Sequence, residues 1–336
     1  MVIVESLGIH LMNKKVIRYF GLIIFLFGTL LALSNLPVRK GFIEYKLSNT
    51  QYEKLVWLGN QFDEGKLKNG NFDFIVIGSS SALYGFNDSF ASLKTINLGV
   101  NTGCRAMELY LLERFLKSGN KTKRIVKEYH ILNTKNFDYY GLHPVLHYFV
   151  SPIWLFQHDQ ALLQPHMFEF VLKRCRVVFQ SWFYFHTKAD YSPDYTGYGY
   201  RTKLSQISER QYIKSKSEAP VTGIVNVSGI RSWYHNYQSQ KSFRIQTDQL
   251  AEKHFEGISY VYFPTLNSLT AKTEQNGSLK YESITLKKSN GLELNVLNLG
   301  KDFVLNRSNW SDPGHYTTKG SRTFSDSLVR YYSQLE

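Results

Sequence analysis

One short stretch decides the fold: Phe72-Asp73-Phe74-Ile75-Val76-Ile77-Gly78-Ser79-Ser80-Ser81. Its first six residues are mostly aromatic or β-branched, which is typical of a buried strand. The glycine and the three serines that follow predict a turn at the end of that strand. Ligands bind at this end of the strands in a parallel sheet, so a serine in the turn is a candidate nucleophile. Glycine and serine clusters are more often ordinary turns, and this stretch alone does not define an active site.

Strand and helix patterns alternate after this stretch. The strands are expected at residues 95–97, 125–132, 258–263 and 292–299, and the helices at residues 106–116 and 321–335. Strand, helix and strand in this order indicate a parallel sheet with helical crossovers. The sheet is therefore expected to begin near residue 71 and to resume near residue 258.

Residues 137–248 differ in character from the rest, because they are crowded with Tyr, Phe and Trp. We expect a large insertion or cap here. Aromatic side chains most often form a core, but they also stack on sugar rings and lie at membrane interfaces. Both interpretations of this segment stay open at the level of sequence.

A transmembrane helix is predicted at residues 19–38, which contain no charged side chain. At about 1.5 Å per residue this segment spans about 30 Å, the thickness of a bilayer's hydrocarbon core. Lys14, Lys15 and Arg18 precede it, so residues 1–18 are expected in the cytoplasm and the main domain outside it, after a linker at residues 39–70. A cleaved signal peptide is the alternative, because Ala32-Leu33-Ser34 fits a signal peptidase site.

The composition excludes several classes of protein. The net charge of +13 suits an anionic membrane surface or an acidic polymer, but its Lys and Arg residues are dispersed and no nucleic-acid-binding motif is present. Two cysteines, Cys104 and Cys175, form neither a disulfide framework nor a metal cluster, and a single bridge between them stays open. No histidine has metal-ligand spacing and no phosphate-binding glycine loop occurs, so no cofactor is expected.

A second motif lies just before the last predicted helix: Ser311-Asp312-Pro313-Gly314-His315-Tyr316-Thr317-Thr318-Lys319-Gly320. An imidazole here can take a serine's proton while a carboxylate three residues away fixes its tautomer. An Asp and a His at this spacing also occur in metal half-sites and helix-capping turns. The position of the two motifs, after the first strand and before the final helix, supports a catalytic interpretation of both.

This arrangement resembles the SGNH family of hydrolases, also called GDSL-like. Gly78-Ser79-Ser80 is similar to the family's Gly-Asp-Ser block with Ser in the middle position, which implies Ser80 as the nucleophile, with Ser81 one register step away as the alternative. Asp312 and His315 match the last block and are implied as the other members of a catalytic triad. Residues 71–136 and 258–336 carry the resemblance.

Two further blocks concern the oxyanion. Residues 97–101 are similar to the second block, which implies that Gly99 donates its backbone N–H to the oxyanion. The family's third block, Gly-x-Asn-Asp, is absent, and Asn133 or, as an alternative, Asn136 is implied as the side-chain donor. For residues 71–336 the resemblance implies a three-layer α/β sandwich with a parallel sheet of flavodoxin-like strand order.

The function implied by the resemblance is that of a membrane-anchored, extracytoplasmic serine acyltransferase or esterase without a cofactor. Its substrates would be acyl groups, acetyl first among them, of a cell-envelope polysaccharide. Its expected partners are the membrane, an anionic polysaccharide and a membrane protein that supplies the acyl group. A lipid esterase at the membrane surface and a non-catalytic envelope assembly protein with a degenerate SGNH fold are the alternatives.

Overall fold

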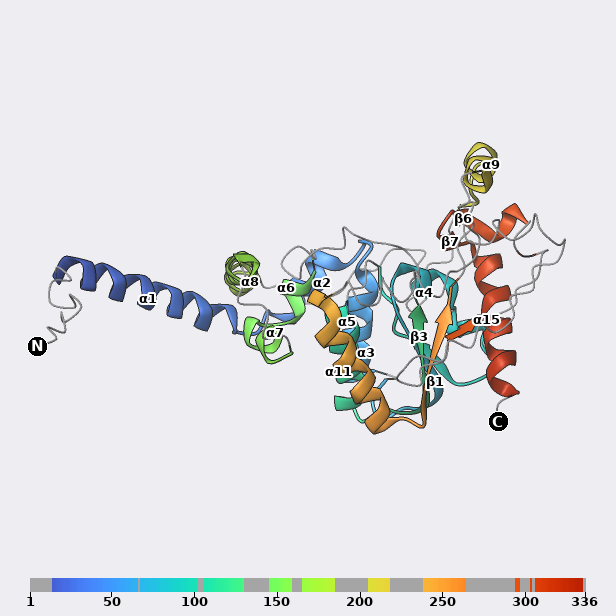
Figure 1. Ribbon diagram of the computed structural model, residues 1–336, viewed down its shortest axis with the longest axis horizontal. Helices are drawn as coiled ribbons and strands as arrows, with labels where there is room; N and C mark the ends of the chain where they lie inside the picture. Colours follow the sequence, from blue (N-terminus) through green and yellow to red (C-terminus); the bar gives the residue numbers. More distant parts are fainter. Residues whose placement is uncertain are drawn as a thin grey trace, which may run out of the picture.

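The computed structural model describes a long N-terminal helix followed by an α/β domain (Figure 1). The residues described are 14–65, 67–101, 105–129, 145–158, 165–184, 205–217, 238–263, 294–296, 303 and 306–334.

A parallel sheet of five strands forms the centre of the domain, in the order β2-β1-β3-β4-β5. The strands are β1 (Asn71–Ile77), β2 (Thr95–Asn97), β3 (Lys121–Tyr129), β4 (Gly257–Tyr262) and β5 (Leu294–Val296). Every pairing between neighbours is parallel. The predicted α/β class and parallel sheet are thus confirmed, and the strand order is the one found in flavodoxin-like folds.

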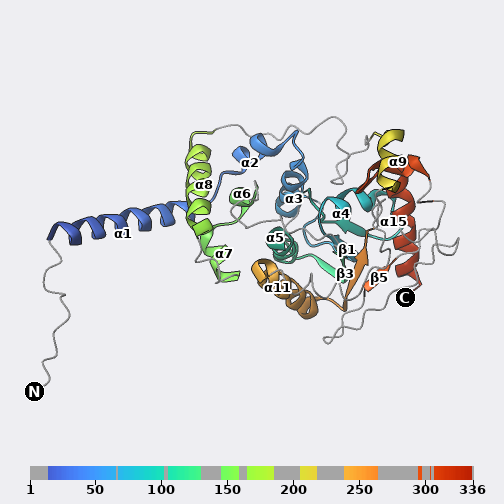
Figure 2. The ribbon, with the colours of Figure 1, turned by 45° about the horizontal axis from the view of Figure 1, so that its top comes forward.

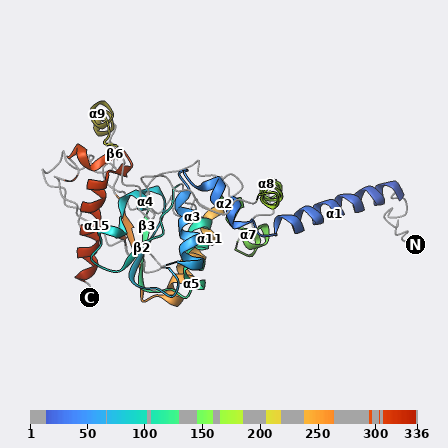
Figure 3. The same cartoon turned by 180° about the vertical axis from the view of Figure 1, so that it is seen from behind.

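Helices cover both faces of this sheet (Figure 1, and from behind Figure 3). One layer contains α3 (Glu53–Glu64), α5 (Arg105–Lys117) and α11 (Gln238–His254), and the other contains α4 (Ser80–Gly85) and α15 (Thr318–Ser333). Successive strand residues point to opposite faces, which divides β1 between two cores. Ile75 and Ile77 belong to the core under α3, α5 and α11, whereas Phe74 and Val76 pack with α4 and α15.

Two domain boundaries differ from those expected. Residues 39–70 do not form an unstructured linker, because they contain α2 (Lys40–Leu47) and α3, whose Leu58 and Phe62 are buried in the main core. At the other end, α11 packs against α5 and leads into β4. Since α11 is a crossover helix of the sandwich, the aromatic insertion ends before Gln238.

The described parts of the insertion are helical. They are α6 (Leu146–Phe149), α7 (Pro152–His158), α8 (Pro165–Trp182) and α9 (Glu209–Ser217). The first three lie between the end of the N-terminal helix and the α3 layer (Figure 2). Leu146, Leu155 and Phe170 join the main core, so this part of the insertion extends the domain's core toward the N-terminal helix.

The N-terminal helix α1 (Lys14–Ser34) projects away from the domain (Figure 2). Its segment Val16–Ser34 is long and apolar enough to cross a membrane, a property that anchors and signal sequences share. The helix ends at Ser34, four residues before the end of the segment expected from sequence, and the chain then enters α2.

Arg174 of α8 fixes the C-terminal end of α1 to the domain. Its guanidinium, which is 3% exposed, donates hydrogen bonds to the carbonyl oxygens of Ser34 (3.2 Å), Leu36 (3.1 Å) and His147 (2.7 Å). Burial lowers the pKa of Arg174 to about 10, so the side chain stays protonated at neutral pH. The last carbonyl groups of a helix lack intrahelical partners, and a buried cation satisfies two carbonyl groups here.

Candidate active site

Ser80 lies at the carboxyl end of β1, where the chain turns into α4. Ser79 is the N-cap of α4, and its Oγ accepts a hydrogen bond from the backbone N–H of Ser81. Ser80 is the first helical residue and is half-buried. Gly78 lets the side chain of Glu128 approach the turn closely, since a Cβ there would lie 2.4 Å from Oε2 of Glu128. The sequence motif therefore forms the predicted strand-to-helix turn.

Asp312 and His315 lie on a hairpin formed by β6 (Trp310–Asp312) and β7 (His315–Tyr316). The turn closes through a hydrogen bond of 2.8 Å from the Gly314 N–H to Oδ1 of Asp312. Below the turn the buried rings of Trp310 and Tyr316 meet edge to face, with centroids 5.1 Å apart. These rings anchor the hairpin in the core under α4 and α15.

The structure brings Ser80, His315 and Asp312 together. Nε2 of His315 lies 2.8 Å from Oγ of Ser80, and Nδ1 of His315 lies 2.7 Å from Oδ2 of Asp312. The ring of Tyr84 meets the imidazole edge to face at 5.2 Å. Hydroxyl, imidazole and carboxylate thus stand in the order that activates a serine. The imidazole contact is to Ser80, which favours Ser80 over Ser81 as the nucleophile.

The environment of Asp312 keeps its carboxylate ionised. Burial alone would raise its pKa, but the hydrogen bond and charge of His315, with the N–H groups of Gly314 and His315, lower the pKa below its ordinary value. A lowered pKa contributes stability that is present above the unfolded value of about 3.9 and is lost as pH falls through the folded value. An ionised Asp312 holds the proton of His315 on Nδ1 and leaves Nε2 free to accept one.

Gly99 does not offer the free N–H that the resemblance implies. Its N–H donates to Oδ1 of Asn97 at 2.7 Å. The amide of Asn97 donates in turn to the carbonyl groups of Ala82, Leu83 and Phe86 in and after α4. Asn97 therefore ties the end of β2 to α4 and uses the Gly99 donor in doing so. A local side-chain acceptor competes with any oxyanion for this group.

Three residues singled out in the sequence lie outside the part of the chain that the structure describes. They are Asn133 and Asn136, the implied side-chain donors of the third block, and Cys104. Cys175 is a free thiol whose Sγ donates to the carbonyl oxygen of Leu30 at 3.0 Å. Among the residues that the structure describes, no three His, Cys, Asp or Glu side chains lie close enough to hold a metal ion.

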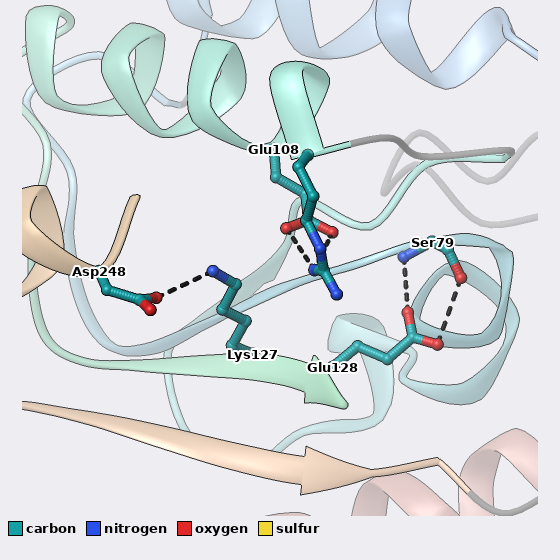
Figure 4. A network of polar contacts seen from close by, with 6 residues as sticks. Ser79, Glu108, Lys127, Glu128 and Asp248 are labelled. Carbon is teal, nitrogen blue, oxygen red and sulfur yellow. Dashed lines mark hydrogen bonds and ion pairs between the residues drawn. The ribbon is translucent and has the colours of Figure 1, made fainter. Parts of the chain in front are cut away.

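Sequence reasoning missed Glu128, which supports the nucleophile turn (Figure 4). This buried residue of β3 accepts hydrogen bonds from the N–H of Ser79 at 2.6 Å and from the Oγ of Ser79 at 3.2 Å. Both carboxylate oxygens thus hold the residue before Ser80. The signal in the sequence was a pair of charges, Lys127 and Glu128, directly after the apolar residues Ile125 and Val126 near the end of the strand.

Lys127, on the opposite face of β3, joins a second buried polar group (Figure 4). Its Nζ lies 3.0 Å from Oδ1 of Asp248 in α11, and nearby Arg105 pairs with Glu108 at 2.7 Å. Burial lowers the pKa of Lys127, while the charges of Asp248 and Glu108 oppose that shift. The carboxyl half of β3 is therefore fixed by polar contacts on both faces, which limits movement of the strand next to the Ser80 turn.

We expect Glu128→Ala to lower the rate at which Ser80 reacts with a fluorophosphonate, by up to about 10²-fold, since small misplacements of reacting groups have effects of this size. The change leaves the buried N–H of Ser79 without its acceptor, at a stability cost of about 1–3 kcal/mol. Glu128→Gln keeps one carbonyl oxygen for that N–H and should restore most of the rate. Stopped-flow kinetics of phosphonylation by a fluorophosphonate probe measures both variants. Equal rates in the two variants would contradict a positioning role for the carboxylate.

Comparisons with known proteins identify no family. No family model and no curated protein matches the chain. A solved structure from Streptococcus pneumonia, provisionally named a platelet activating factor, aligns over 93% of this chain and 99% of its own with 12% identity and a TM-score of 0.30. A TM-score of this size does not establish a shared fold, and no argument below rests on it.

Proposed function

We propose that this protein is a membrane-anchored, extracytoplasmic serine acyltransferase or esterase of the SGNH type. Its proposed substrates are acyl groups, acetyl first among them, on a cell-envelope polysaccharide. The observation that carries the proposal is the contact of His315 with Ser80 on one side and Asp312 on the other. The strand order and the positions of both motifs at the carboxyl edge of the sheet add support.

The proposed reaction has two halves. Oγ of Ser80 attacks the acyl carbonyl carbon and passes its proton to Nε2 of His315, and the imidazolium then protonates the leaving group, which departs and leaves an acyl ester on Ser80. A water molecule or a sugar hydroxyl attacks that ester in the second half, with His315 as the base. The products are a free acid or a newly acylated sugar, and Ser80 regains its proton.

The negative charge of the tetrahedral intermediate needs donors close to Ser80. Ser80 is the first residue of α4, and the first N–H groups of a helix have no intrahelical acceptor. We assign the oxyanion to the backbone N–H of Ser80, because the Gly99 N–H already donates to Asn97. Each such donor lowers the barrier by about 3–4 kcal/mol.

The location of the site supports a polymer substrate over a membrane lipid. The half of the domain that carries α4, β6 and β7 lies far from α1 along the long axis of the molecule, which is horizontal in Figures 1 and 3. An ester in the bilayer around α1 would lie at the opposite end of the molecule. The net charge of +13 suits an acidic polymer. An assembled Ser80-His315-Asp312 set also supports catalysis over a degenerate, non-catalytic role.

Arg174 supports a retained anchor over a cleaved signal sequence. Cleavage after Ser34 would detach α1 and break the chain at the carbonyl group that Arg174 Nε contacts. A buried guanidinium that loses one of its three carbonyl partners is destabilised, because charged groups need full pairing away from water. We therefore propose that α1 stays attached and spans the membrane.

The experiment that tests the proposal is labelling of the purified full chain with a fluorophosphonate probe. We expect labelling of the wild type and of Ser81→Ala, and none of Ser80→Ala, because the hydroxyl in contact with Nε2 of His315 is that of Ser80. Ser81→Ala is the matched control, since it removes the neighbouring hydroxyl of the same turn. A well-folded wild type that takes no label would refute the proposal. Label that persists in Ser80→Ala but vanishes in Ser81→Ala would move the nucleophile to Ser81.

A further inference from the structure

Helix α8 carries a stripe of exposed apolar side chains. Its members are Phe168 (50% exposed), Leu172 (42%), Phe179 (60%) and, directly after the helix, Phe183 (67%). At about 100° per residue, continued to Phe183, these positions fall within an arc of about 60°. The opposite side of α8 is buried, with Phe170 and Val177 in the protein interior. The helix is thus apolar on both sides, one toward the protein and one toward the surroundings.

Contacts with α1 fix the direction in which the stripe points. Phe168, a member of the stripe, stacks on Phe27 with ring centroids 6.3 Å apart. Arg174, on the buried side of α8, donates hydrogen bonds to Ser34, the last residue of α1, and to Leu36 just after it. The stripe therefore faces the earlier residues of α1, and the buried side faces the domain.

The positions of these contacts along α1 also indicate how deep the stripe would lie in a membrane. Phe27 precedes Ser34 by seven residues, which is about 10 Å along a helix. Ser34 ends the segment that is apolar enough to span a membrane. Helix α8 crosses that end at a steep angle (Figure 2). If α1 spans the bilayer, α8 lies in the plane of the membrane, with its stripe at the depth of about 5–10 Å that amphipathic interfacial helices reach.

Helix α7 extends the same surface. Ile153 and Phe156 are exposed there, and the N–H of Ile153 donates to Oδ1 of Asn35, the residue after the span, at 3.0 Å. Arg176, exposed on α8 beside the stripe, supplies positive charge at the level of lipid phosphates. Helix α7 thus adds exposed apolar groups next to the end of the span, and α8 adds a basic group beside its stripe.

We propose that α8, Phe183 and the exposed side chains of α7 form an in-plane membrane-binding surface that enters the lipid boundary beside α1. The occupant is the bilayer and not a second copy of the chain, because the surface is continuous with the spanning segment and points along it. This inference rests on the retained anchor of the proposed function. Together α1 and α8 hold the domain by two crossed helices, which restricts its tilt on the membrane.

Spin labels on the full chain in bilayers of phosphatidylethanolamine and phosphatidylglycerol test this surface. Cys104 and Cys175 are first replaced by serine, and a nitroxide is then attached to Phe179→Cys, Phe183→Cys or, as control, Asp326→Cys on the exposed side of α15. We expect labels at 179 and 183 to collide more often with lipid-soluble oxygen than with a water-soluble nickel chelate, and the label at 326 to show the reverse.

Two outcomes would overturn the inference. Labels at 179 and 183 that meet nickel as often as the label at 326 does would place the stripe in water. Labels protected from both reagents, with spin–spin broadening, would show that a second copy covers it. The intact mass of each sample reports whether α1 is attached, and fluorophosphonate labelling of the same samples tests the serine separately. These two measurements distinguish an error in the proposed anchor or in the proposed serine chemistry from an error in the proposed membrane-binding surface.

Discussion

Phosphonylation of Ser80 by the fluorophosphonate probe, in which fluoride leaves, should slow about 10⁴-fold when Asp312 is replaced by asparagine. The change removes one negative charge and little volume. An asparagine can still accept the Gly314 N–H through its oxygen, which directs its amide N–H toward Nδ1 of His315. The imidazole then carries its own proton on Nε2, where it donates to Ser80 instead of accepting from it. The variant should therefore keep the β6–β7 hairpin but lose the ability of Nε2 of His315 to accept the proton of Ser80.

Asp326→Asn provides the matched control, because it makes the same chemical change at an exposed site on α15. The rate of Ser80 phosphonylation in this variant should equal that of the wild type. Unfolding temperatures of both variants show whether the fold persists. An Asp312→Asn protein that reacts within about tenfold of the wild-type rate would mean that the carboxylate does not set the tautomer of His315.

Gly320→Ala should destabilise the protein by about 3 kcal/mol, through overpacking against backbone. A Cβ at Gly320 would lie 2.2 Å from the carbonyl oxygen of Asn309. That oxygen also accepts the N–H of Thr317, the N-cap of α15. Backbone atoms give way less easily than side chains, so α15 must move away from Asn309 to make room. Asn309 directly precedes β6, and the shift would disturb the hairpin that carries His315.

Gly59→Ala in α3 is the control for this change, because nothing lies within 4 Å of a Cβ at that position. It should stabilise the protein by about 0.5–1 kcal/mol, since alanine favours a helix over glycine. Thermal unfolding of the full chain in detergent measures the difference, and we expect Gly320→Ala to lower the midpoint by roughly 5–10 °C. Equal midpoints for the two variants would show that α15 does not pack closely against Asn309.

The strands could be predicted because their signals are local. Residues 72–77 and 95–97 were expected as strands and lie in β1 and β2. The pairing of Ser80 with His315 could be anticipated only by combining two distant motifs, since 235 positions separate them. The periodicity of apolar residues predicts the strands and helices. Their alternating order predicts a parallel sheet, and the two motifs are then expected to meet at its carboxyl edge.

Side-chain contacts between segments that meet only in the folded domain have weak signals in the local sequence. The sequence shows Asn97 and Gly99 but not that the Asn97 side chain bends back onto the Gly99 N–H. Glu128 is one of several charged residues in β3, and its partner Ser79 is 49 positions away, so nothing local distinguishes it from the others. Helix α3 was missed although Leu55, Leu58 and Phe62 have helical spacing. The residues after the apolar segment were interpreted as a linker, so the start of the domain was expected near residue 71 instead of before α3.

The neighbours β3 and β4 are separated in the chain by residues 130–256, and this has a consequence for the order of folding. During synthesis β1, β2 and β3 can pair early, whereas β3 must wait for its second neighbour until the whole insertion has been made. An unpaired central edge invites aggregation, and charges that point out of a strand discourage it. Lys127 places such a charge on β3 during that interval, before Asp248 of α11 encloses it.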